Sequence, residues 1–224
     1  MSDKALLTRG ELELTQKIQR EFPVGGVIHP NIIKELNDCP QDDFGKRLAV
    51  WLQNRGQLQI ISTTGIVPPK GGVILPLTVP VNEAREWREA IRAGCPETPS
   101  NCDILKVCDQ YPPLAGAMVR LEQIWLANFG KGSATPSDQA LSWGKKQKLI
   151  PVSPRACFAV AEHFPAFHTC LGMNPLAVVS LRTCNFGGGS RVCYSWFGGS
   201  ERRAYLYWFG YDCSDYCWFA FARE

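Results

Sequence analysis

Apolar residues in the first part of the chain recur at the spacing of one helix face. The stretch from residue 8 to 22 has this period, and Pro23 with two glycines soon after it ends the stretch. A second helix is predicted to begin at Pro30 and a third to cover 42–56, and a strand-like alternation follows. We therefore predict that residues 1–66 form a separate helical unit, with the element order of a winged-helix module.

The charge of this helical unit argues against a nucleic-acid role. Residues 1–66 hold eight Lys and Arg against eight Asp and Glu, so they offer no basic surface to phosphates. Protein docking or oligomerisation through these helices is favoured over nucleic-acid binding. A helical extension that packs on the main domain explains the pattern equally well.

Glycine and proline separate this unit from the rest of the chain. Gly65–Gly72 is the predicted linker, and the main domain is predicted to cover residues 73–224. Val73–Val81 is apolar and rich in β-formers, but its two prolines restrict it to a sheet edge or an extended arm. Asn82–Ala93 is predicted to be a helix that Asn82 caps.

The middle of the chain alternates between irregular stretches and short helices. Gly94–Leu114 has four prolines and three cysteines and is predicted to be a loop with one short strand, Ile104–Cys108. Val119–Asn128 fits a strand or a helix, and the pattern leaves both open. Helices are predicted over Asp138–Lys148 and, with a Ser-Pro start, over Ser153–His163.

The segment Cys184–Glu224 has an unusual pattern. Thirteen of the chain's 24 aromatic residues lie between Phe186 and Phe221, among Gly, Ser, Asp and Cys rather than aliphatic residues. Trp196–Phe197 and Trp208–Phe209 are predicted strand centres, and Trp218–Phe221 is a predicted closing strand. The residues expected to form a mostly buried framework are Trp196, Trp208, Trp218, Phe219 and Phe221.

Between these framework positions the aromatic residues have polar neighbours and no consistent period. Tyrosine gives large, rigid and half-polar contact area at a low entropy cost, and Ser and Gly adapt to a ligand. Clustered exposed aromatics mark binding surfaces, and a twisted antiparallel sheet with large cross-strand pairs is the alternative explanation. The predicted ligand-binding residues are Tyr194, Phe197, Gly198, Gly199, Tyr205, Tyr207, Phe209, Tyr211, Asp212, Cys213, Ser214, Asp215, Tyr216 and Cys217. Those expected to be mostly exposed are Tyr211, Asp212, Ser214 and Tyr216.

The segment Tyr211–Cys217 resembles the variable region of diversity-generating retroelement target proteins. In that family, adenine-directed mutagenesis rewrites codons, and the resulting residues are enriched in Tyr, Ser, Asp, Cys, Phe, Gly and Asn. Asp138–Ala161 is similar to the helix, LPT-like strand and second helix of the family's C-type-lectin fold, which formylglycine-generating enzymes share. Leu149–Pro154 is a loose version of the LPT motif, and the closing GFR-type strand is Phe219–Arg223 here. The resemblance covers residues 73–224 and implies an α+β, C-type-lectin-like domain.

Composition and charge limit the functions that remain. The 224 residues are 45% hydrophobic and 20% charged, which suits a folded globule. The net charge of +3 is too small to indicate nucleic-acid or acidic-membrane partners. Residues 1–16 have charges where a signal peptide has an apolar run, and no stretch reaches the roughly 18 apolar residues of a membrane span. We therefore expect a cytoplasmic protein without a membrane span.

The ten cysteines are the other unusual feature of the composition. Because nothing resembles a signal peptide, we predict that they are mostly reduced. Cys95, Cys102 and Cys108 contain no CxxC pair, which argues against a zinc site. Cys184 and Cys193 fall on candidate neighbouring strands and are predicted to be free buried thiols.

Patterns that indicate catalysis are few. His163 and His168 are five apart, a spacing that does not place two metal ligands on one helix face. The motifs of serine hydrolases, P-loop proteins, zinc peptidases and dinucleotide-binding enzymes do not occur in the required context. The favoured hypothesis is a non-enzymatic binder of a protein or other macromolecular ligand, with no cofactor and no metal.

The alternative hypothesis is a cysteine-dependent redox or metal enzyme on the same fold. The fold relatives that oxidise cysteine need a copper-binding Cys pair. Cys213 with Cys217, or Cys184 with Cys193, resembles such a pair.

Overall fold

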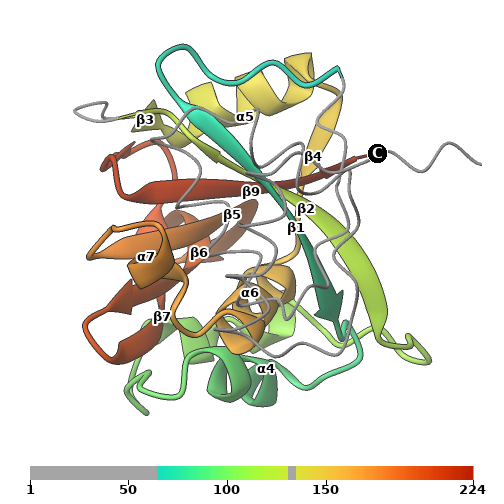
Figure 1. The fold of residues 1–224 in the computed structure, drawn as a ribbon. Coiled ribbons are helices and arrows are strands. Elements are labelled where there is room, and N and C mark those ends of the chain that lie inside the picture. Colours follow the sequence, from blue (N-terminus) through green and yellow to red (C-terminus); the bar gives the residue numbers. More distant parts are fainter. Residues whose placement is uncertain (1–64, 131–134, 224) are drawn as a thin grey trace, which may run out of the picture. The chain divides into compact units, whose positions relative to one another are not determined.

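The computed structural model of the chain describes residues 65–130 and 135–223 (Figure 1). The chain divides between Ile60 and Ile61 into two units, and the described residues belong to the second unit. Nearly all of the predicted helical unit, residues 1–64, lies outside the described residues.

Nine strands occur in the described residues. They are β1 Val73–Val81, β2 Arg120–Asn128, β3 Thr135–Pro136, β4 Leu149–Pro151, β5 Leu176–Phe186, β6 Gly189–Gly198, β7 Glu201–Trp208, β8 Asp212–Cys213 and β9 Cys217–Arg223. Seven of these described strands form one sheet in the order β1-β2-β9-β5-β6-β7, in which β4 also pairs with β9. β5 and β9 run parallel and the other neighbours antiparallel. β3 pairs with β8 separately.

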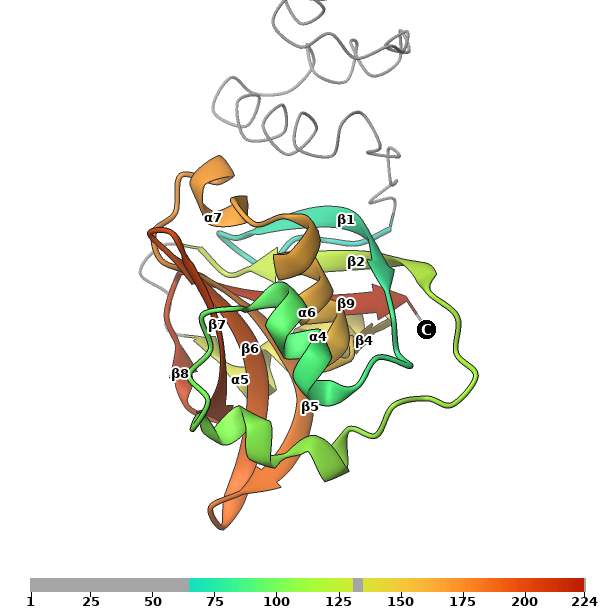
Figure 2. The same cartoon turned by 90° about the horizontal axis from the view of Figure 1, so that it is seen from below.

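Helices cover both faces of this sheet. They are α4 Trp87–Gly94, α5 Ser137–Lys146, α6 Pro154–His163 and α7 Phe167–Cys170, with 3₁₀ turns at Asp103–Lys106 and Cys108–Gln110. α6 packs on β1, β5 and β6, and α4 packs on α6 (Figure 2). On the other face, Gly144 of α5 lies directly against the Phe221 ring of β9. The described part is therefore an α+β architecture that consists mostly of strands.

β1 lies at one end of the strand order, as its two prolines predict. Its side chains alternate, so that Leu77, Val79 and Val81 are buried and their neighbours are not. Gly72, at the end of the predicted linker, lies so close to β2 that a Cβ atom would stand 2.0 Å from the Asn128 carbonyl oxygen. The prediction of an edge strand is confirmed.

β9 is buried on both faces. All residues from Cys217 to Phe221 are buried, and the strand lies between β2 and β5. A strand that is covered on both faces needs a continuous apolar run rather than alternation, which explains the Trp-Phe-Ala-Phe sequence. The predicted strand is confirmed, and it occupies the interior of the sheet.

α6 begins as the sequence predicts. The Ser153 hydroxyl oxygen accepts a hydrogen bond from the Ala156 amide, and Pro154 is the first helical residue. Every residue from Pro154 to Ala161 is buried. A helix that is covered all round is expected where the sheet lies on one side and a second helix, α4, on the other.

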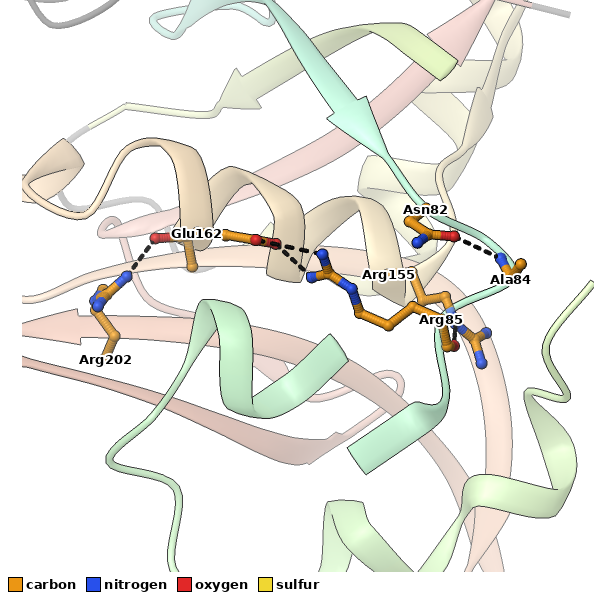
Figure 3. A network of polar contacts seen from close by, with 7 residues as sticks. Asn82, Ala84, Arg85, Arg155, Glu162 and Arg202 are labelled. Atoms are coloured by element: carbon orange, nitrogen blue, oxygen red, sulfur yellow. Dashed lines mark hydrogen bonds and ion pairs between the residues drawn. The ribbon is translucent and has the colours of Figure 1, made fainter. Parts of the chain in front are cut away.

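A polar network holds α6 to the segment before α4 and to β7 (Figure 3). Arg85 Nη1 lies 2.6 Å from Glu162 Oε2. Arg155 Nε donates to the Arg85 carbonyl at 2.9 Å, and Arg202 Nη1 donates to the Ala161 carbonyl at 2.7 Å. Burial lowers the pKa of the Arg155 guanidinium. These contacts satisfy charged groups in positions where an unpaired charge would be costly.

Two predictions of local structure are wrong. The helix predicted over Asn82–Ala93 begins only at Trp87, because the Asn82 side chain accepts from the Ala84 amide and closes a local turn instead of capping a helix. The segment Ile104–Cys108, predicted to be a strand, contains 3₁₀ turns. Val119–Asn128, which the pattern left open, forms strand β2 from Arg120 onward.

Candidate ligand-binding surface

β6 and β7 carry different chemistry on their two faces. The register places Tyr194 opposite Tyr205, and side chains alternate along a strand, so that their neighbours point the other way. One of these neighbours, Ser195, donates a hydrogen bond to the Cys157 carbonyl in α6. One face of the two strands therefore packs on α6 and on the 3₁₀ turn Asp103–Lys106, which contacts β7, and the opposite face carries tyrosines.

Five of the six tyrosines in the sequence gather on that face. The Tyr194 ring centre lies 5.6 Å from that of Tyr205 and 6.3 Å from that of Tyr207. Tyr207 and Tyr211 are 6.4 Å apart with nearly perpendicular rings. Aromatic pairs in such arrangements gain about 0.5–1.5 kcal/mol beyond the burial of their area. Together with Tyr216, which lines the same hollow as Tyr194 and Tyr207, we call these residues the tyrosine surface.

The tyrosine surface is fixed at its base and open at its rim. Tyr194, Tyr207 and Tyr216 are half-buried and pack against the core cluster between the sheet and α5. Tyr207 Oη donates to the Asp212 carbonyl at 3.2 Å. Tyr211 is 58% exposed. Rigid rings with accessible edges are the kind of surface that binds a ligand at a low entropy cost.

A hollow of about 40 Å³ lies within the tyrosine surface. Its floor comes from β5, where Ala177 and Val179 are buried, and its walls come from β6, β7 and the β8–β9 turn. The residues that line the hollow are Ala177, Val179, Tyr194, Tyr207, Cys213, Ser214, Tyr216 and Cys217. Six of these eight belong to the set predicted from the C-terminal segment. Ala177 and Val179 are not in that set, because nothing in the sequence distinguishes them from other residues of an apolar strand.

Two thiols meet at the hollow. Cys213 and Cys217 are 3% and 8% exposed, and the Cys213 sulfur lies 4.0 Å from the Ser137 hydroxyl oxygen of α5. A hydrogen bond from the Cys217 thiol lowers the pKa of Cys213. The same bond, together with burial, raises the pKa of Cys217. Both cysteines, which the sequence placed in an exposed contact loop, are buried wall positions.

A second pair of thiols lies away from the hollow. A hydrogen bond from Cys193 lowers the pKa of Cys184 to about 7, and a further hydrogen bond from Tyr111 acts in the same direction. Burial raises the pKa of Tyr111, whose ring stacks on Trp87 at 4.8 Å. Both cysteines are buried free thiols, as predicted. The sequence did not point to Tyr111, which is distant in the chain and lies in a proline-rich loop.

The predicted division into framework and contact residues is partly correct. Trp218 is 4% exposed, and its Nε1 donates to the Met173 sulfur at 3.2 Å, as a framework residue should. Trp208 is 37% exposed, so the prediction that it is buried is wrong. It ends β7, where it stacks on Tyr211 and lies under the Arg191 guanidinium. Trp196 is half-buried.

Three of the predicted contact positions lie at the β6–β7 hairpin. Phe197 is fully buried against Phe167, and Gly198 is buried as well, so neither presents a side chain to a ligand. A Cβ atom on Gly198 would stand 2.2 Å from the Trp196 ring. Gly199 has φ of +59° and opens the two-residue turn, a conformation that favours glycine. Asp212 and Ser214 are exposed, as predicted, and so is Asp215, whereas Tyr216, which was predicted to be exposed, is half-buried.

Within residues 65–130 and 135–223, no three His, Cys, Asp or Glu side chains cluster as a metal site would require. None of the helices found there is both long enough and apolar enough to pass through a membrane.

Comparisons of the chain with protein families, with characterised proteins and with solved structures find no match.

Proposed function

We propose that this protein is a non-enzymatic binder that recognises a protein or other macromolecular ligand through the tyrosine surface. The observation that supports this most directly is the two-sided chemistry of β6 and β7. Their inner face packs on α6 and on the 3₁₀ turn Asp103–Lys106, whereas their outer face gathers Tyr194, Tyr205 and Tyr207 beside the exposed Tyr211. A solvated sheet face needs polar residues for solubility and does not need tyrosines in contact with one another.

The same arrangement separates stability from recognition. Trp218, Phe219 and Phe221 are buried in β9. Their packing stabilises the sheet and does not depend on which side chains occupy the rim of the tyrosine surface. Surface changes away from caps and packed residues alter stability by only about 0.5 kcal/mol. Residues such as Tyr211 and Ser214 can therefore vary at little cost to the fold.

We further propose a C-type-lectin-like fold and an origin as the target of a diversity-generating retroelement. In support, the segment that resembles the family's helix, LPT-like strand and second helix forms α5, β4 and α6 in that order. The retroelement proposal is tested in the genome. A near-copy of the coding segment for residues 184–221, differing at adenines and lying near a reverse transcriptase gene, supports it. An isolated coding sequence without such a repeat refutes the retroelement origin and leaves the binding function to be tested separately.

The binding function is tested by selection from a random peptide library displayed on phage, with the immobilised full chain as bait. We expect enrichment of specific peptides, which a Tyr205→Ala, Tyr207→Ala, Tyr211→Ala triple variant no longer captures. The matched control is Met118→Ala with Leu121→Ala, because these residues are also exposed but lie elsewhere. Equal capture by the triple variant would show that the tyrosine surface is not the binding site.

A second candidate function rests on the two thiols at the hollow. Cys213 and Cys217 line the same hollow, and the lowered pKa of Cys213 favours its thiolate, the reactive form of cysteine. A redox or metal enzyme predicts stoichiometric copper or zinc in protein purified without chelator. Loss of that metal in Cys213→Ser and Cys217→Ser would favour the enzyme over the binder.

A further inference from the structure

We propose that the hollow in the tyrosine surface receives one short aliphatic side chain of the ligand, Val, Leu or Ile, and that a basic residue of the ligand flanks this side chain. This inference rests on the binding function proposed above and names the chemistry of the partner.

The lining of the hollow selects for an apolar group. Its floor is the methyl groups of Ala177 and Val179, which are 1% and 3% exposed. Tyr194 and Tyr207 contribute ring faces or edges, and the remaining walls hold two thiols, the Tyr216 ring and Ser214. The lining contains no Asp, Glu, Lys, Arg or His, so a charged group of the ligand would find no oppositely charged side chain of these types at the bottom. Free cysteine behaves as a small hydrophobe, which adds to the apolar character.

The size of the hollow selects for a short group. Small-molecule sites occupy about 300–1,000 Å³, whereas this hollow has about 40 Å³. A cavity needs about 10–15 Å³ to hold one water-sized group. The hollow therefore has room for roughly three carbon-sized groups, which is the branched end of Val, Leu or Ile and less than an aromatic ring.

The rim of the hollow favours a positive neighbour. Asp212 is exposed, and its backbone carbonyl accepts the hydrogen bond from the Tyr207 hydroxyl at the hollow's wall. Two arginines of β6 and β7 have partners within the protein. Arg203 pairs with Glu201 at 2.7 Å, and the Arg191 guanidinium lies on the Trp208 ring. A buried anchor that is surrounded by a polar rim is the usual arrangement at the centre of protein interfaces.

The test changes the size of the hollow and follows the anchor that is selected. With the wild-type full chain, the random peptide library should yield peptides that share Val, Leu or Ile next to Lys or Arg. Val179→Ala removes two methyl groups from the floor, and the consensus should then shift to a larger residue such as Met or Phe. Ala177→Val adds two methyl groups, and the Kd of a wild-type peptide should rise about tenfold.

The matched control is Val178→Ala. Val178 adjoins Val179 in β5 but pairs with Ser195, which faces α6, so its side chain lies on the other face of the sheet. Val178→Ala therefore removes the same two methyl groups as Val179→Ala, but away from the hollow. This variant should lose stability and keep the wild-type consensus. Asp212→Lys should remove the preference for Lys or Arg and keep the aliphatic anchor. Thermal unfolding of each variant identifies any that fail to fold, and Ala177→Val and Val179→Ala test the hollow independently.

The outcomes separate this inference from the proposed function. Peptides that are enriched on the tyrosine surface without a shared aliphatic residue overturn the inference and leave the binding function intact. An unchanged consensus in folded Val179→Ala overturns it as well. If no peptide is enriched by the wild-type chain, the binding function itself fails, and the inference fails with it.

Discussion

At the scale of single residues, the C-terminal tryptophans differ in role although their sequence contexts are similar. Trp218 and Trp208 each stand beside a phenylalanine in an aromatic segment. The sequence therefore could not distinguish them, since exposure depends on the tertiary contacts that each one makes. Trp218 is enclosed by Phe167 and Met173, whereas Trp208 lies at the open end of β7.

This difference predicts unequal costs of substitution. Trp218→Ala should lower the free energy of unfolding by about 3–5 kcal/mol, because it leaves a large cavity. Trp208→Ala should cost about 1 kcal/mol, because the side chain is partly solvated in the folded state. Urea denaturation followed by circular dichroism measures both values. Equal losses would contradict the assignment of Trp208 to the surface.

The buried thiol of Cys184 predicts a dependence of stability on pH. Its pKa falls from the usual 9.0 to about 7 in the folded chain. Between these values the unfolded chain holds a proton that the folded chain has lost, so this thiol stabilises the fold as pH rises from 7 to 9. The contribution is at most about 3 kcal/mol and is lost as pH falls through 7. Above pH 9 the trend should reverse, because burial raises the pKa of Cys95 and Cys157.

The free energy of unfolding in urea, measured under reducing conditions at pH 7, 8 and 9, tests this prediction. Cys184→Ala should remove the rise, and so should Cys193→Ala, which removes the hydrogen-bond donor. Cys157→Ala is the matched control, since it deletes another buried thiol and should keep the rise. The same dependence of stability on pH in wild type and Cys184→Ala would disprove the role of Cys184.

At the scale of elements, predictions succeeded where a local signal decides the structure. The Ser153–Pro154 start of α6, the prolines of β1 and the apolar run of β9 each act within a few residues. The start of α4 was misplaced because Asn82 can close a turn as well as cap a helix, and only the tertiary contacts of Trp87 decide between them.

The start of α6 gives a prediction at this scale. Ser153→Ala should lower the free energy of unfolding by about 1–2 kcal/mol, because the Ala156 amide loses its acceptor. The Glu83 carboxylate also loses the hydroxyl that donates to it. Ser153→Thr keeps the hydroxyl and should restore most of the stability. If Ser153→Ala leaves the midpoint of thermal unfolding unchanged, the Ser153 cap contributes nothing to stability.

At the scale of the whole molecule, the α+β class was predictable, and the hollow was not. The hollow combines residues of β5 with residues of the β8–β9 turn, and these meet because β9 runs parallel beside β5. A local sequence pattern does not predict pairing between strands that are so distant in the chain. The composition of the C-terminal segment indicated which residues would gather, whereas the sheet order determines what lies beneath them.

The division of the chain predicts that residues 61–224 fold without the first 60. The core clusters found in the described part draw on elements from Ile66 to Phe221. The shortened chain should unfold in one cooperative transition and should bind a library-selected peptide with the Kd of the full chain. Circular dichroism and peptide titration test this. Non-cooperative melting would show that the first unit is needed for the fold.

The position of β9 has a consequence for how the protein is made on the ribosome. β9 bridges β2, β4 and β5, which all precede it in the chain. While a nascent chain still lacks Cys217–Arg223, the edges of β2 and β5 have no strand between them, and such edges are prone to aggregate. Sheet closure must therefore wait until Cys217–Arg223 has been translated, and a stop codon just before Cys217 would yield a product for proteolysis rather than a smaller binder.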